Sequence, residues 1–127
     1  MTAETSKNMS FDPAAASVRF HAVIGDLDFE AIEAFFADDA TYSSGKVGGL
    51  KGRTDIMAAF RRYFTEYPDQ VAEDSLVEQV SPLAARVVWS LRATSASTGE
   101  PLVRRGEETI TFNDQGKIID VHVTDFQ

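Results

Sequence analysis

The spacing of apolar residues changes near residue 70, and this change constrains the fold more than any other feature of the sequence. Before it, apolar side chains recur at steps of three and four residues, which indicates amphipathic helices. These predicted helices span 14–24, 29–37 and 54–67. Beyond it, apolar and polar residues alternate in runs separated by short turn sequences, which indicates strands joined as antiparallel hairpins. These predicted strands span 71–80, 84–96, 102–112 and 117–126. We therefore expect an α+β domain in which three N-terminal helices pack against an antiparallel sheet.

The ends of this pattern define the expected domain. Residues 1–10 are polar and are interpreted as a flexible N-terminal segment, whereas Asp12 can cap a helix whose first residue is Pro13. A short β-prone run over 40–44 is followed by glycines, which predicts a strand and then a loop. These glycines stand at 45, 48, 49 and 52. A single domain over 11–127 is expected, because a chain of 127 residues favours one core.

Composition argues against several functions. The chain has 12 Lys and Arg against 20 Asp and Glu, a net charge of −8, which disfavours nucleic acid and anionic membrane as partners. It has no cysteine, and its two histidines lack the spacing of metal ligands, so no metal site is expected. No apolar run approaches the roughly 18 residues of a membrane span, and the first residues do not resemble a signal peptide. We expect a cytoplasmic protein that uses no cofactor.

Four short motifs carry a resemblance to a known family. They are Gly25-Asp26-Leu27-Asp28, Phe36-Ala37-Asp38-Asp39-Ala40-Thr41, Gly52-Arg53 with Ile56, and Phe112-Asn113-Asp114-Gln115-Gly116-Lys117-Ile118. In this order and spacing they resemble the SnoaL-like branch of the nuclear transport factor two-like superfamily, over about residues 12–126. The resemblance implies a cone-shaped α+β barrel, a curved sheet wrapped around helices with a mostly apolar pocket at its open end. The superfamily includes ketosteroid isomerases and polyketide cyclases, but also transport factors and association domains, so the fold alone does not give the function.

Strand alternation predicts which side chains face such a pocket. Glu108 shares a face with Ile110 and Phe112, whereas the adjacent Glu107 points the other way. The polar residues expected to face the pocket are Tyr42, Ser44, Arg104, Glu108 and Asp125. The apolar walls are expected to include Phe60, Phe64, Trp89, Leu91 and Val121. In the last strand Ile119, Val121 and Val123 are expected to pack inward, with His122 on the outer face.

Glu108 is the principal catalytic candidate. A carboxylate among apolar side chains loses hydration, which favours the protonated form or a general base poised near neutrality. The alternative is an ion pair with Arg104, two residues away on the same face. Tyr42 and Asp125 are further catalytic candidates, and Ser44, Phe60, Phe64, Trp89, Arg104 and Val121 are candidates for ligand contact.

The resemblance to ketosteroid isomerase is incomplete at the site residues. Glu108 occupies the place of the protonated carboxylic acid of that isomerase, a known case of such tuning. The catalytic aspartate of the isomerase falls on Ser44, and its helix-borne tyrosine falls on Val18. An error of one or two residues in this register would place His21 or Phe20 near that tyrosine position, so His21 is a further candidate. Steroid isomerisation is therefore not expected.

Three functions stay open at this point. The chain is an acid/base enzyme acting on a small, neutral, largely apolar molecule, or a non-catalytic binder with the same pocket, or an association domain. A homodimer through the outer face of the sheet is expected in each case, because members of this superfamily commonly associate there.

Overall fold

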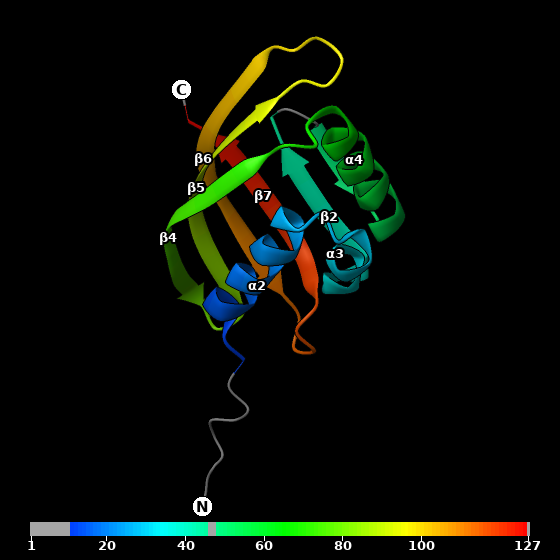
Figure 1. Cartoon of the computed structure of the whole chain (residues 1–127). Helices are drawn as coiled ribbons and strands as arrows, with labels where there is room; N and C mark the ends of the chain where they lie inside the picture. The colour runs from blue at the N-terminus through cyan, green and yellow to red at the C-terminus, as the bar shows by residue number, and fades with distance from the viewer. Residues whose placement is uncertain (1–10, 46–47, 127) are drawn as a thin grey trace, which may run out of the picture.

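In the computed structural model, which describes residues 11–45 and 48–126, three helices and a short hairpin precede four long strands (Figure 1). The helices are α2 (Pro13–Gly25), α3 (Phe29–Phe35) and α4 (Arg53–Glu66). The strands are β2 (Phe36–Ser44), β3 (Gly48–Lys51), β4 (Val71–Ser81), β5 (Ala84–Thr94), β6 (Pro101–Phe112) and β7 (Ile118–Asp125). The predicted α+β class is confirmed. Among the described residues, no helix has the length and apolar character needed to cross a membrane.

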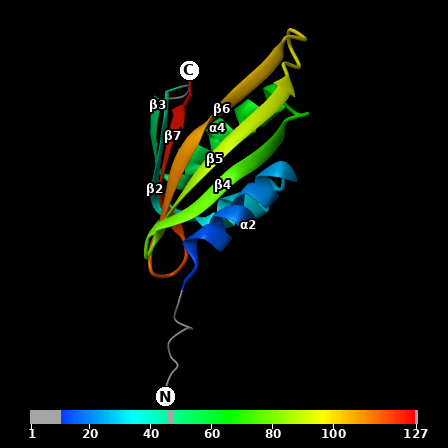
Figure 2. The same cartoon turned by 90° about the vertical axis from the view of Figure 1, so that its left-hand side faces the viewer.

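The strands form one six-stranded sheet in the order β3-β2-β7-β6-β5-β4. The pairs from β4 to β7 are antiparallel, as predicted. The pairing of β2 with β7 is parallel, with Tyr42 opposite Val121, so the sheet is antiparallel at every junction except this one. The sheet curves around the helices without closing, because β3 and β4 remain its two edges (Figure 2). One concave face is therefore left for a core and a cavity.

The first two helices begin where the sequence predicts. The carboxylate of Asp12 accepts a hydrogen bond from the backbone N–H of Ala15 at 3.1 Å, and Pro13 is the first residue of α2. Asp28 caps α3 in the same way. The helix α3 ends at Phe35, two residues earlier than predicted, because the fully buried Phe36 already belongs to β2.

The glycine-rich segment is not simply a loop. Gly48–Lys51 forms β3, which pairs antiparallel with β2 and places Lys51 opposite Thr41. The predicted loop is wrong over these four residues, because the available edge of β2 outweighs the low strand propensity of glycine. Gly52 then begins α4 with φ 95°, a conformation that favours glycine. Residues 46–47 and the predicted flexible segment 1–10 lie outside the described residues.

The core lies between the helices and the concave face of the sheet. Its largest fully buried side chains include Phe20, Phe36, Phe112, Ile32, Ile56, Ile110 and Ile118. Ile119 was expected to point inward but is 37% exposed. The pairing between β6 and β7 shifts register at this point, so Ile119 is the extra residue of a bulge and Ile118 takes the inward position.

Candidate functional site

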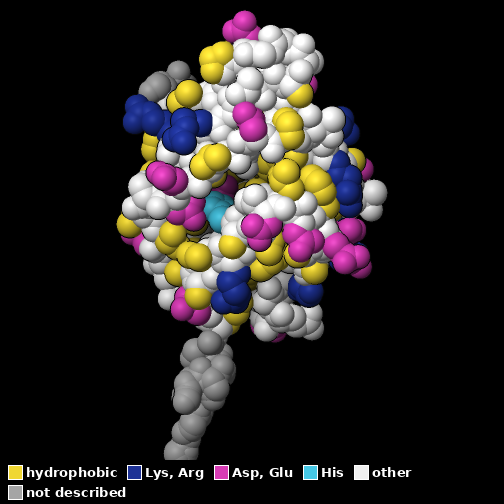
Figure 3. Space-filling model, in the orientation of Figure 1, with side chains coloured by type: hydrophobic (Ala, Val, Ile, Leu, Met, Phe, Trp, Pro, Cys, Tyr) yellow, Lys and Arg dark blue, Asp and Glu magenta, His cyan; other side chains and the backbone are white. Residues whose placement is uncertain are grey.

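A cavity of about 340 Å³ opens between the concave face of the sheet and the helices α2 and α4. Its apolar lining includes Ile24, Leu50, Phe60, Phe64, Leu91 and Val123. The helix α2 presents one stripe to the core and another to the cavity. The cavity stripe consists of Val18, His21, Ala22 and Gly25. In Figure 3 a histidine side chain is visible in a hollow of the surface, with acidic side chains beside it.

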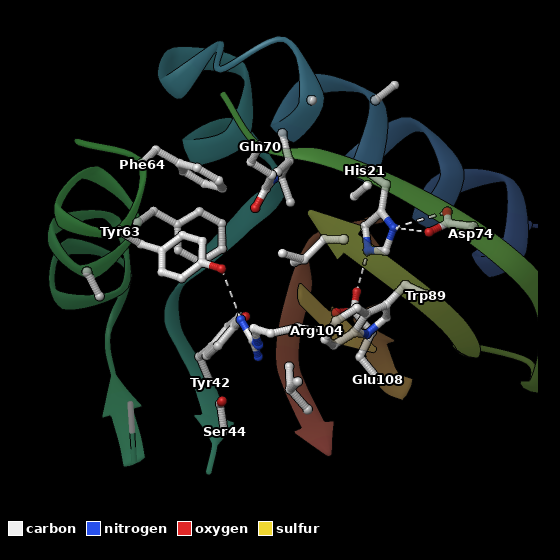
Figure 4. Close-up of a pocket in the computed structure, with 18 of the residues that line it drawn as sticks. His21, Tyr42, Ser44, Tyr63, Phe64, Gln70, Asp74, Trp89, Arg104 and Glu108 are labelled. Carbon is white, nitrogen blue, oxygen red and sulfur yellow. Dashed lines mark hydrogen bonds and ion pairs between the residues drawn. The ribbon is translucent and has the colours of Figure 1, made fainter. Parts of the chain in front are cut away.

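His21 joins two carboxylates that come from different strands (Figure 4). Its Nδ1 lies 2.8 Å from Oδ1 of Asp74 on β4, and its Nε2 lies 2.5 Å from Oε2 of Glu108 on β6. Glu108 is 8% exposed, and the side chains of His21 and Asp74 are 19% and 20% exposed. The three residues form a bridge from the edge of the cavity to its wall. We call Asp74, His21 and Glu108 the His21 bridge.

The bridge carries a protonated imidazole. Burial alone would lower the pKa of His21, but the charge of Glu108 and the hydrogen bonds to Asp74 and Glu108 outweigh burial. Together they raise the pKa of His21 from 6.5 to about 10. At neutral pH both ring nitrogens therefore carry protons, and each donates to a carboxylate oxygen. The imidazolium offsets part of the negative charge of the two acids.

A second ion pair lies on the same wall. The guanidinium of Arg104 donates to both carboxylate oxygens of Asp125, at 2.9 and 2.8 Å, and to the hydroxyl of Tyr63 at 3.1 Å. The guanidinium carbon also lies 5.2 Å from the ring centroid of Trp89, a cation–π contact. Burial would lower the pKa of Arg104, but the hydrogen bonds to Asp125 and Tyr63 raise it. Arg104 is thus fixed as a charged group.

The indole Nε1 of Trp89 is buried without an acceptor among the described residues. The hydroxyl of Tyr42, on the same wall of the cavity, forms no hydrogen bond with another described residue. Burial, followed by the negative charge of Glu108, raises the pKa of Tyr42, so its hydroxyl stays protonated. The hydroxyl of Tyr42 is therefore a donor that a molecule in the cavity can use.

Most of the residues predicted for the site line this cavity. They are Tyr42, Ser44, Phe60, Phe64, Trp89, Arg104 and Glu108. Val121 is fully buried in the core instead, and Val123, two residues further along the same face of β7, lines the cavity. Asp125 is not part of the lining, because it turns to Arg104. The ion pair between Glu108 and Arg104, which was the alternative for Glu108, is not formed, since Glu108 contacts His21 and Arg104 contacts Asp125.

The sequence did not predict Asp74 as a site residue, and it gave His21 as a candidate only if the alignment with the isomerase is shifted by one or two residues. A signal for His21 exists in the helix. Val18, His21, Ala22 and Gly25 follow the spacing i, i+3, i+4 and i+7, which defines a second face beside the core face. No comparable signal exists for Asp74, because a bulge between Asp74 and Leu76 breaks the alternation of β4.

The comparisons with known proteins agree with this architecture. A crystal structure of an NTF2-like protein of unknown function from Exiguobacterium sp. 255-15 has a TM-score of 0.77 at 16% identity, covering 88% of this chain and 98% of that one. The epoxide hydrolase/cyclase-like enzyme SalBIII, described in pyran ring formation in the polyether salinomycin, has a TM-score of 0.78 at 15% identity, covering 89% of each chain.

A third similar structure holds a ligand. RV0760c from Mycobacterium tuberculosis, in complex with estradiol-17β-hemisuccinate, has a TM-score of 0.77 at 20% identity, covering 89% of this chain and 93% of that one. At these identities the likeness shows the fold alone. A search of curated proteins gave no significant match. The family model of the SnoaL-like domain matches residues 18–121, which is most of the chain, and the protein therefore belongs to the SnoaL-like family of the nuclear transport factor two-like superfamily.

Proposed function

We propose that the protein binds a small, neutral, largely apolar molecule in this cavity and acts on it by acid/base chemistry centred on Glu108. The observation that carries the proposal is the position of Glu108, a carboxylate 8% exposed on the wall of an apolar cavity. One of its oxygens, Oε2, is bound by His21. No described residue donates a hydrogen bond to the other, Oε1. That oxygen can take a proton from a bound molecule, or return one.

The charges of the wall support a neutral ligand. His21 is compensated by Asp74 and Glu108, and Arg104 is compensated by Asp125. An anionic ligand would therefore compete with carboxylates for cations that are already paired. Tyr42 can donate its hydroxyl to a carbonyl or ether oxygen of the ligand. The steroid part of the estradiol derivative in a structure of the same fold supports a largely apolar ligand, although its hemisuccinate group itself carries a carboxylate.

The reaction class is narrower than in the superfamily as a whole. Ser44 and Val18 both line the cavity, at the positions where the resemblance places the base and the tyrosine of ketosteroid isomerase. Neither side chain matches these roles, because an isopropyl group carries no proton to donate and a serine hydroxyl is a far weaker base than a carboxylate. We therefore propose an isomerase, cyclase, hydrolase or lyase reaction without cofactor, other than steroid isomerisation.

Binding of 2-naphthol and of estradiol, two neutral phenols of different size, tests this proposal. Both are expected to change the fluorescence of Trp89, the single tryptophan of the chain. Ala59→Phe, which fills the cavity from α4, should weaken binding, whereas Ala58→Phe on the exposed side of the same helix should not. Equal binding by the two variants would place the ligand elsewhere and refute the proposal.

A non-catalytic binder is the second candidate, and the unpaired hydroxyl of Tyr42 favours it as much as it favours an enzyme. The two candidates differ at Glu108. If the protein is an enzyme, Glu108→Gln should abolish turnover and leave the affinity for the substrate unchanged. If it is a binder, Glu108→Gln should lower the affinity, and no turnover is seen in either form. A panel of epoxides, enones and lactones, followed by mass spectrometry, supplies the substrates for this comparison.

We also propose a homodimer through the outer face of the sheet. Leu76 is 43% exposed and Val103 is 75% exposed, and alternation places both on this face. Sedimentation at micromolar concentration should give twice the 13.9 kDa of one chain. Leu76→Glu should shift the protein to the monomer, because it places a charge in the contact. A wild-type monomer would refute the dimer.

A further inference from the structure

We infer that His21 is the positioning residue of Glu108, a doubly bound imidazolium that holds one carboxylate oxygen and directs the other into the cavity. This inference rests on the proposed function, since it assigns a second residue to the same site. It concerns a side chain on α2, while Glu108 itself belongs to β6.

The geometry carries the first step. Nε2 of His21 lies 2.5 Å from Oε2 of Glu108, and Nδ1 lies 2.8 and 3.0 Å from the two oxygens of Asp74. With both ring nitrogens bound, the imidazole plane cannot rotate without breaking two contacts. The carboxylate of Glu108 is therefore fixed through Oε2, on a side chain that lines the cavity (Figure 4).

The charges around the bridge carry the second step. The acidic groups that face His21 are Asp74 from β4 and Glu108 from β6, and Trp89 from β5 packs beside them. Glu108 also faces the neutral hydroxyl of Tyr42 from β2, while Arg104 is bound to Asp125. His21 is thus the cation in direct contact with Glu108. The hydrogen bond and the compensating charge that Glu108 receives therefore come from one side chain, and both are lost when the imidazole is removed.

A purely structural role is the alternative. The bridge also connects α2 to β4 and β6, so its loss would loosen the fold even if Glu108 had no function. A test must therefore follow the chemistry of Glu108 and not stability alone. Bound 2-naphthol serves this purpose, because its excited state is a strong acid. It transfers its proton to a nearby base, and the naphtholate then emits at a longer wavelength than the naphthol.

The first measurement concerns Glu108. Wild type should show naphtholate emission from the bound probe at neutral pH, and Glu108→Gln should lose it. If the probe fails to bind, or if Glu108→Gln emits as wild type does, the proposed function fails and the inference must stand on the imidazole alone.

The second measurement concerns His21. In His21→Ala the naphtholate emission of the bound probe at neutral pH should fall several-fold, because the carboxylate of Glu108 is no longer held through Oε2. Added imidazole should restore the wild-type emission, because it can occupy the vacated space as a cation. His21→Gln keeps a donor toward Glu108 but no charge, so it should retain the direction of the carboxylate and most of the emission.

The control variant is Asp74→Asn, which keeps the contact between His21 and Glu108 and removes one charge from the far side. It removes a negative charge and leaves the side chain that holds Glu108, so the emission of the bound probe should stay close to that of wild type. If His21→Ala loses stability but keeps the wild-type emission in the folded protein, His21 is a structural link and the inference is overturned.

A readout without any ligand decides the inference if the probe does not bind. The ¹⁵N resonances of the His21 ring should show both nitrogens protonated at pH 8. A neutral His21 ring at that pH would overturn the inference whatever 2-naphthol does.

Discussion

The Nε2 atom of His21 lies 2.5 Å from Oε2 of Glu108, although 87 residues separate the two in the chain. This contact joins α2 to β6 at the lining of the cavity. It also explains how a carboxylate stays in an apolar wall, because the imidazolium supplies a hydrogen bond and a compensating charge in place of the hydration that the carboxylate loses. Both properties can be measured on single variants.

Glu108→Gln should lower the free energy of unfolding at neutral pH by about 2 kcal/mol, because it leaves a charged imidazole with one partner instead of two. Chemical denaturation measures this loss. Glu107→Gln is the matched control, since Glu107 is the preceding residue and pairs with Arg86 on the outer face. Its loss should stay below about 1 kcal/mol, as for surface ion pairs. Equal losses would show that the buried position of Glu108 does not matter.

Stability should depend on pH through His21. Because folding raises the pKa of His21 from 6.5 to about 10, the folded state binds its proton more tightly than the unfolded state does. The resulting stabilisation is complete below about pH 6 and declines as the pH rises through the raised value. The difference in unfolding free energy between wild type and His21→Gln should therefore shrink between pH 7 and pH 10. A difference that grows over this range would contradict the assigned protonation.

Arg104→Lys should destabilise the fold by about 1 to 3 kcal/mol, because one ammonium group cannot replace the forked contact with Asp125 and the hydrogen bond to Tyr63. Thermal unfolding measures the change. Arg105→Lys is the control, since Arg105 is exposed on the opposite face of the same strand. A similar melting temperature for wild type and Arg104→Lys would mean that the pair contributes little.

The class of fold follows from the sequence because helical and alternating periods are properties of whole segments. The hairpins from β4 to β7 and the caps Asp12 and Asp28 depend on neighbours close in the chain, so local reasoning finds them. The parallel pairing of β2 with β7 and the formation of β3 depend on which edges meet after folding. No local pattern contains that information.

The candidate site likewise contains features that local sequence predicts and features that depend on contacts formed only after folding. Alternation in β6 correctly places Glu108 and Arg104 on the inner face, because this strand pairs with β5 in one continuous register. The partners of these two residues come from elsewhere: His21 from a helix and Asp125 from a strand end. From the sequence, an ion pair between Arg104 and Glu108 is plausible, because the two residues share one face of β6. In the fold, each of them contacts a group of opposite charge from another element.

Bulges account for the remaining errors. In β7 the extra residue is Ile119, which turns outward although it is as apolar as the buried Ile118. In β4 the pairing with β5 shifts register between Asp74 and Leu76. Val77, which packs against the core, and Asp74, which lines the cavity, therefore lie on the same face of the sheet although they are three positions apart. One inserted residue reverses the face of everything beyond it, and the sequence does not mark where this happens.

Gly106 should be the position in β6 least tolerant of a side chain. A Cβ placed there would lie 2.3 Å from the carbonyl oxygen of Thr124 and 3.1 Å from Cζ2 of Trp89. The first neighbour is backbone of β7 and cannot move without disturbing the ladder, so Gly106→Ala should cost about 3 kcal/mol. The displaced indole should also change the fluorescence of Trp89 in the folded protein. Gly49→Ala, in β3, is the control, because nothing lies within 4 Å of a Cβ at that position. If Gly106→Ala is as stable as Gly49→Ala and its emission is unchanged, then Trp89 does not rest against this glycine, and the wall of the cavity beside Glu108 is built differently.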